Sequence, residues 1–172
     1  MGFGDYVKRG IEIVKLDSSA VMHASRDANA FSMGLLVLLI AGIASAIGQL
    51  NLFGIIINPI GTIIGAFVWV GILHIFALLF GGRASYSELF RPLALAMVLN
   101  WITVIPLLGV FLGFLAGVWQ IVVSVVAVEN VYRLSRGKAI AVVLIPLAML
   151  FILAFCFVFF VGTAFLFGNM MG

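Results

Sequence analysis

Charged side chains are missing from three long blocks of the sequence, and this absence constrains the fold more than any other feature. Residues 28–82, 92–128 and 139–172 contain no Asp, Glu, Lys or Arg. Only 9% of the chain is charged, against about 25% in a typical soluble domain, so an ordinary water-exposed surface cannot be built. The blocks are about 55, 37 and 34 residues long, and a helix crosses the hydrocarbon core with about 20. Length therefore predicts two, two and one membrane spans.

The basic residues predict how these spans are oriented. All nine lie before or between the uncharged blocks, at Lys8, Arg9, Lys15, Arg26, Arg83, Arg91, Arg133, Arg136 and Lys138. Cytoplasmic loops attract Lys and Arg, so we expect all three charged segments on that side. An even number of spans must then separate them. The predicted fold class is an all-α membrane protein, a bundle of five transmembrane helices with a cytoplasmic N-terminus and a C-terminus on the outer side.

Capping residues indicate where the helices begin. The spans are predicted at residues 28–50, 59–80, 89–105, 109–128 and 139–167. Asn58 before Pro59 is typical of an N-cap followed by proline at the first helical position. Ser85 and Glu88 have the spacing of a capping box at the start of the third helix.

Residues 1–27 are predicted to be a cytoplasmic amphipathic segment ahead of a single transmembrane domain at residues 28–172. Apolar residues recur there at helical spacing, at Phe3, Tyr6, Val7, Ile11 and Val14. The charged residues of this segment lie mostly on the other side of the helix. A helix of this kind is typical of the membrane interface. It is interpreted either as a passive anchor before the first span or as an element that senses lipid or docks a partner.

Four uncharged polar residues are expected inside the bilayer. Helical rise places Asn100 and Gln120 near the midplane, and His74 and Ser124 closer to the cytoplasmic side. Polar side chains at such depth are often functional. They form either a polar ligand pocket open toward the cytoplasm or interhelical hydrogen bonds that hold the bundle together. We expect Asn100 and Gln120 to bond each other, another bundle residue or a buried water, and not to face lipid.

Glycines recur every four residues in two of the predicted spans. The fourth span has Gly109, Gly113 and Gly117, and the second has Gly61 and Gly65. Small residues at this spacing let helices approach closely. We expect the fourth helix to pack through its glycines against another helix of the same chain, with a homodimer seam as the alternative.

The residues give little basis for catalysis or for a bound cofactor. The sequence has no carboxylate pair, no metal-ligand cluster and no nucleophile motif, so we expect no enzyme activity, no cofactor and no metal site. Ser124 with His74 lacks an acidic residue that would orient a Ser–His pair. Nine scattered basic residues do not predict nucleic-acid binding.

Short motifs lie at or near the predicted turns. They are Gly81-Gly82-Arg83 with Ser85 and Tyr86, Ile105-Pro106-Leu107-Leu108-Gly109, Trp119, and Leu134-Ser135-Arg136-Gly137-Lys138-Ala139. In order and spacing this stretch resembles the Yip domain family, the Ypt-interacting membrane proteins, and looks like its prokaryotic branch. The resemblance implies five spans, a cytoplasmic N-terminus and a prokaryotic cell membrane. Eukaryotic members bind Rab-type GTPases, but their acidic-Leu-Tyr-Gly-Pro motif is absent here, and Tyr132 stands where prokaryotic members often have His.

Two classes of function remain open from the sequence. The first is a non-enzymatic membrane scaffold in the lipid bilayer, alone or as a homo-oligomer, that binds a protein partner or shapes the bilayer through its cytoplasmic face. The second is a carrier or channel for a small neutral or apolar molecule, with a pocket near Asn100 and Gln120. A lipid-modifying enzyme that uses Ser124 and His74 is a third hypothesis. A continuous cavity reaching Asn100 and Gln120 would favour the second class, and a dry core filled by Trp and Phe the first.

Overall fold

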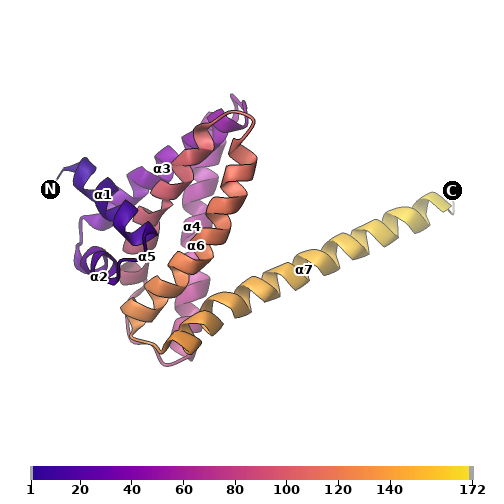
Figure 1. Ribbon diagram of the computed structural model, residues 1–172. Coiled ribbons are helices and arrows are strands. Elements are labelled where there is room, and N and C mark those ends of the chain that lie inside the picture. The colour runs from indigo at the N-terminus through magenta and orange to yellow at the C-terminus, as the bar shows by residue number, and fades with distance from the viewer. Residues whose placement is uncertain (1, 171–172) are drawn as a thin grey trace.

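The uncharged blocks fold into long helices, most of which stand side by side in one bundle (Figure 1). The computed structural model describes residues 2–170, with side chains described as far as Val161. In chain order the elements are α1 (Phe3–Val14), α2 (Ser18–Arg26), α3 (Ala30–Gly48), α4 (Gly54–Leu79), α5 (Tyr86–Ala96), the 3-10 helix η1 (Met97–Val104), α6 (Gly109–Tyr132) and α7 (Arg136–Met170). Residues 2–170 contain no strand, so the all-α prediction is confirmed.

Four helices in the described part of the chain are long and apolar enough to cross a membrane. They are α3, α4, α6 and, within α7, Arg136–Val161. The spans predicted at residues 28–50, 109–128 and 139–167 correspond to α3, α6 and α7, with ends that differ by a few residues. Five unbroken helical spans are not found, because the third predicted span has a different structure.

The third predicted span, residues 89–105, consists of two helices of different type. The capping box forms: Ser85 Oγ accepts from the Glu88 N–H at 3.4 Å, and Glu88 Oε2 accepts from the Ser85 N–H at 2.6 Å. The chain then changes from α-helix to the 3-10 helix η1. Trp101 Nε1 donates to the carbonyl oxygen of Val37 on α3 at 3.2 Å, so a partner far away in the sequence holds this stretch. Apolar periodicity does not carry that information.

The start of α4 was wrongly predicted. The helix begins at Gly54, so Pro59 lies inside it and Asn58 is not its N-cap. Asn51 supplies the side-chain acceptor instead, taking the Gly54 N–H on Oδ1 at 3.0 Å. An interior proline removes one helical hydrogen bond, and at this position the backbone of α3 comes very close. A Cβ added to Gly42 would lie 2.3 Å from the Pro59 Cα.

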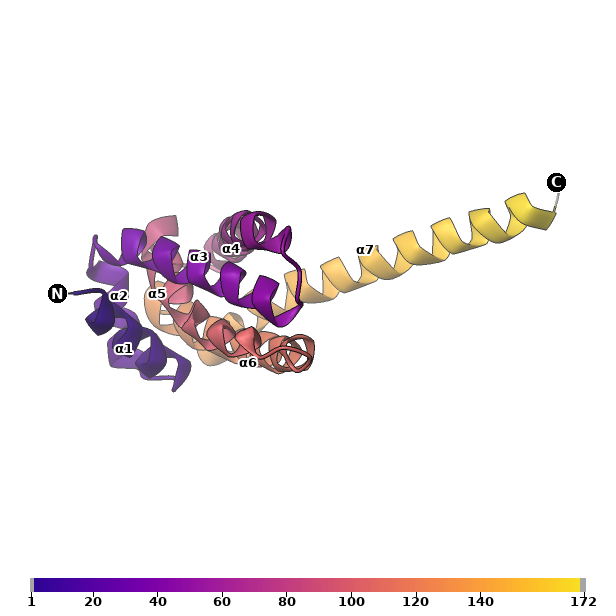
Figure 2. The same ribbon diagram turned by 90° about the horizontal axis from the view of Figure 1, so that it is seen from above.

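The N-terminal segment forms two helices, α1 and α2, that lie together on one side of the bundle (Figure 2). The apolar face of α1 packs against the protein: Tyr6 and Ile13 are buried. A Cβ on Gly10 would lie 2.5 Å from the carbonyl oxygen of Leu95 on α5. Trp119 on α6 donates from Nε1 to the Val14 carbonyl at 2.9 Å. The helix is therefore docked on the bundle along its length.

The last helix, α7, extends away from the others (Figures 1 and 2). Its first turns are packed, with Ala139, Val142 and Val143 buried. The large apolar side chains from Met149 to Val161 are exposed, which is a stable arrangement for a helix surrounded by lipid.

Candidate functional site

Two cavities are found in the described part of the chain, and one of them is lined by most of the polar residues singled out from the sequence. The larger lies among the long helices and has a volume of about 530 Å³. It is lined by α3, α4, α5, η1 and α6, together with Leu147 of α7. Asn100, Gln120 and Ser124 all face it, as do Trp69 and Thr62. The structure thus brings three of the four predicted polar residues to one cavity.

The two amides in this cavity have acceptor atoms without partners. Asn100 Oδ1 and Gln120 Oε1 are both buried, and neither accepts a hydrogen bond from the described residues. The Asn100 Nδ2 has only a weak contact with Met97 Sδ at 3.9 Å. No hydrogen bond joins the two amides within the part of the chain that is described. A buried carbonyl oxygen without a donor costs about 1–3 kcal/mol, so both atoms can bind a ligand donor favourably.

Glycines open this cavity instead of closing it. Gly65, Gly113 and Gly117 all line it. No atom lies within 4 Å of a Cβ added at Gly117 or Gly65, and the same holds for Gly61. The close helix contact expected at these three positions does not form within the described part of the chain.

Close packing occurs at one end of the glycine series. A Cβ on Gly109 would lie 2.4 Å from the Thr103 carbonyl oxygen and 3.2 Å from the Gly48 Cα. At Gly113 the Thr103 Cγ2 is 3.4 Å away, an ordinary contact. The first turn of α6 therefore packs tightly on η1 and the end of α3.

His74 has a different neighbourhood from Ser124. The Ser124 hydroxyl donates to the Gln120 carbonyl oxygen in its own helix at 2.8 Å. His74 Nδ1 instead forms a short hydrogen bond with the hydroxyl of Tyr132. The two residues considered as a Ser–His pair therefore have separate partners.

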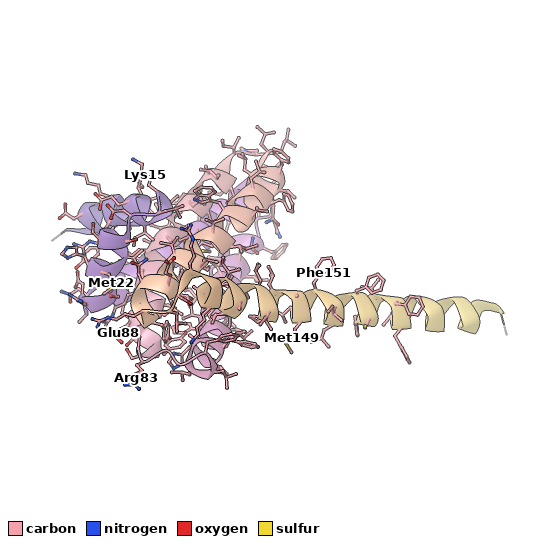
Figure 3. The ribbon with its side chains drawn as sticks, turned by 60° about the horizontal axis from the view of Figure 1, so that its bottom comes forward. Lys15, Met22, Arg83, Glu88, Met149 and Phe151 are labelled. Carbon is pink, nitrogen blue, oxygen red and sulfur yellow. The ribbon has the colours of Figure 1, made fainter. Side chains whose placement is uncertain are left out.

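The second cavity, which we call the arginine pocket, has a volume of about 410 Å³. It lies where α2, the α4–α5 loop, the start of α5 and the end of α6 meet, and Figure 3 shows three of its residues, Met22, Glu88 and Arg83, along one edge of the bundle. Its lining residues are Met22, Ser25, Arg26, Gly81, Arg83, Ala84, Glu88, Val131, Tyr132 and Arg133. Sequence reasoning missed this pocket because its three arginines come from three distant segments.

The three arginines of this pocket keep their donors available. Among the described residues, the side chains of Arg26, Arg83 and Arg133 make no hydrogen bond or ion pair. Glu88, the pocket's one carboxylate in the described lining, is held by the Ser85 N–H and hydroxyl. These bonds, helped by nearby arginines and opposed by burial, lower the pKa of Glu88. The pocket therefore has a surplus of positive charge at neutral pH.

Several motif residues from the sequence meet around the same end of the bundle. Gly81 has a φ of 91°, a conformation that suits glycine, and ends α4. A Cβ on Gly82 would lie 2.5 Å from the Tyr132 ring. Lys138 Nζ donates to the Phe80 carbonyl oxygen at 3.3 Å, and the Ala139 N–H donates to the Ser135 carbonyl at 3.0 Å. The remaining motif residues have other places: Leu134 packs on the core, and Pro106 lies in the turn before α6.

Apolar helices of membrane-spanning length, with charged residues confined to the helix ends, the segments between the helices and the segment before the first, define a multi-pass helical membrane protein. The Yip1 domain family model matches residues 28–158. The protein belongs to this family, as its motifs predicted. No curated protein and no solved structure matches the chain.

Proposed function

We propose that the chain is a non-enzymatic membrane protein that holds a small, largely apolar molecule in its intramembrane cavity, as a carrier or a channel. One observation supports this most strongly: a cavity of about 530 Å³ contains two buried amide oxygens, on Asn100 and Gln120, that lack donors. Ligand pockets usually combine an apolar lining with a few well-placed polar groups. The complementary ligand has an apolar body and one or two hydrogen-bond donors, such as a long-chain alcohol.

Fluorescence quenching by a brominated long-chain alcohol tests this proposal. Trp69 lines the cavity, so a protein with Trp101→Phe and Trp119→Phe reports on Trp69 alone. We expect saturable quenching by the bromoalcohol and weaker binding of the matching bromoalkane, which has no donor. Gly117→Leu should fill the cavity and abolish the quenching, because that position has open space around it. Equal quenching in the Gly117→Leu variant would show that the probe dissolves in the surrounding lipid instead.

Leucine at Asn100 or Gln120 should separate ligand binding from packing. Since both amide oxygens lack donors, replacing either side chain by an apolar one of similar size should leave the melting temperature in detergent unchanged or raised. The preference for bromoalcohol over bromoalkane should fall about fivefold or more in each variant, as one hydrogen bond is lost. A lowered melting temperature with an unchanged preference would identify both amides as packing residues.

The same proposal includes five membrane crossings, with the charged ends in the cytoplasm. The stretch formed by α5 and η1 has 11 α-helical and 8 3-10 residues. At about 1.5 and 2.0 Å per residue these span about 32 Å, of which the uncharged part, residues 92–104, covers about 24 Å. With Glu88 and Arg91 at the headgroup level, the uncharged part and the turn that follows it together make up the fifth crossing that we propose, at the short end of the usual length. The positive charges favour the cytoplasm for the charged end.

Cysteine labelling tests this topology. In a Cys156→Ser background, which removes the exposed native thiol, single cysteines are introduced at Asn51 and Ser135. We expect a membrane-impermeant maleimide to label position 51 in intact cells, and position 135 only after the membrane is opened. Labelling of both positions from the same side would contradict the five-crossing arrangement.

A second candidate function is supported by the arginine pocket. Its three arginines form a positively charged recess at the end of the bundle where we place the cytoplasm. A scaffold that binds a partner through its cytoplasmic face would use such a recess. The two functions use separate cavities, so one molecule can combine them.

A further inference from the structure

We propose that the arginine pocket binds the phosphate of an anionic phospholipid headgroup. This site is separate from the intramembrane cavity. The inference rests on the second candidate function and names the class of ligand that the arginine pocket binds. The ligand is a lipid of the surrounding bilayer whose headgroup carries a phosphate monoester, and its acyl chains lie against the outside of the bundle.

The charges of the pocket select an anion. Arg26, Arg83 and Arg133 line it from α2, the α4–α5 loop and the end of α6, so they surround the space from three directions. Arginine presents five donors in a planar fork that fits phosphate oxygens. A fourth guanidinium lies behind the wall: Arg91 Nη1 donates to the Ser25 carbonyl at 2.7 Å, while its buried Nε has no partner. Three cations thus line a space that has one carboxylate, on Glu88, and a fourth contacts the wall of that space at Ser25.

The carboxylate of Glu88 caps helix α5. Its Oε2 takes both the N–H and the hydroxyl of Ser85, at 2.6 and 2.8 Å, and so completes the cap of α5. The arginines are therefore not neutralised by an ion pair within the described part of the chain, where Arg9 with Asp27 is the recorded salt bridge. An incoming phosphate meets donors that have no competing partner to displace.

The position of the pocket favours a lipid as the source of that phosphate. Arg83 lies four residues beyond the end of α4, and Arg133 directly follows α6; both of these helices are long enough to cross the membrane. Residues at the ends of spans lie at the level of the headgroups, where basic pockets between helices recognise anionic lipids. Apolar residues complete the lining, Met22, Ala84 and Val131, and suit the glycerol and first acyl carbons of a lipid.

The backbone at Arg133 makes this position suitable for testing the pocket. Its φ is 53°, the left-handed conformation that glycine adopts most easily at the end of a helix. Leu16, Leu50 and Leu107 have a φ in the same range, so the conformation belongs to the ends of helices in this chain and does not by itself identify a binding residue. It provides a useful variant, because Arg133→Gly removes the guanidinium while relieving the backbone.

Titration of the full-length protein in detergent tests the proposal. The probes are short-chain phosphatidic acid, phosphatidylcholine of the same chain length and inorganic phosphate. Binding of each probe is measured by native mass spectrometry and by thermal shift. The wild type should bind phosphatidic acid more tightly than phosphatidylcholine. Arg83→Gln and Arg133→Gly should each weaken phosphatidic acid binding about fivefold or more, which corresponds to one arginine–phosphate contact. Arg133→Gly should do so without lowering the melting temperature.

Arg136→Gln is the matched control. Arg136 is an exposed arginine at the same end of the bundle, three residues after Arg133, and it does not line the pocket. The Arg136→Gln protein should bind phosphatidic acid as tightly as the wild type does. Equal weakening by Arg136→Gln would show general charge attraction and overturn the site. Phosphatidylcholine has a phosphodiester and a choline cation, so its equal binding would overturn the assignment of an anionic phosphate monoester. Equal protection by inorganic phosphate would overturn the lipid as the source of the phosphate. None of these outcomes changes the bromoalcohol result, so this inference and the proposed function fail separately.

Discussion

Replacing Gly48 with alanine should lower the free energy of unfolding by about 3 kcal/mol, the upper end of the usual range for an overpacked core. The added Cβ would lie 1.8 Å from the Thr103 carbonyl oxygen and 3.5 Å from the Gly109 Cα. Both neighbours are backbone atoms, so no rotation of a flexible side chain relieves the overlap. The end of α3 would have to move away from η1 and α6. Thermal unfolding in detergent, followed by circular dichroism, measures the loss.

Gly117→Ala is the control, and it should change stability in the opposite direction. Gly117 also lies within a helix, but no atom is within 4 Å of its added Cβ. Alanine there stabilises the helix by about 0.5–1 kcal/mol. Equal losses at both positions would mean that the contact between α3, η1 and α6 is not the tight point described above.

Replacing Asp27 with alanine should release α1 from the bundle. Asp27 Oδ2 accepts from the Tyr6 hydroxyl at 2.9 Å and from Arg9 Nη1 at 3.0 Å. Tyr6 is buried, and the side chains of Arg9 and Asp27 are only 15% and 22% exposed. Hydrogen bonds to a charged group at such depth contribute about 1.5–3 kcal/mol each, so we expect a loss of about 3 kcal/mol. Amide hydrogen exchange in α1 should accelerate roughly hundredfold. Glu12→Ala, which removes an exposed carboxylate of α1 whose side chain makes no hydrogen bond among the described residues, should leave that exchange rate unchanged.

The same contact makes the docking of α1 depend on pH. Burial raises the pKa of Asp27, but hydrogen bonds from Tyr6, the Asn29 N–H and Arg9 outweigh it, so the pKa is lowered overall. A lowered pKa stabilises the folded form fully above the unfolded value, about 3.9, and this contribution is lost as pH falls through the folded value. Protection of the α1 amides should therefore weaken only in acid below about pH 4. Asp27→Asn should remove this dependence, while a wild type without it would contradict the role of the carboxylate.

The sequence predicted those features that depend on local composition. Uncharged blocks located the apolar helices, and the Ser85–Glu88 spacing located the start of α5 correctly. Partners that are distant in sequence could not be predicted in this way. The α-to-3-10 change after α5 accompanies a bond from Trp101 to α3, and the docking of α1 depends on Leu95 and Trp119.

The candidate sites were predicted in part for the same reason. Helical rise gave Asn100 and Gln120 a common depth, and the structure brings both to one cavity. Periodicity of the glycines, however, does not reveal what lies opposite them: Gly109 meets a backbone, whereas Gly117 meets open space. The arginine pocket has no local signal at all, since Arg26, Arg83 and Arg133 are adjacent only after folding.

The docking of α1 also has a consequence for the order in which the protein matures. The bond from Trp119 to the Val14 carbonyl joins residues 105 positions apart. Ribosomes add about 5–20 residues per second, so α1 waits roughly 5–20 seconds for this partner to be synthesised. During that time its buried face, with Tyr6 and Ile13, is available to a chaperone or to the membrane surface. Although α1 leaves the ribosome before the spans described here, it reaches its final position only after α6 is made, and its docking marks a chain whose spans up to α6 are in place.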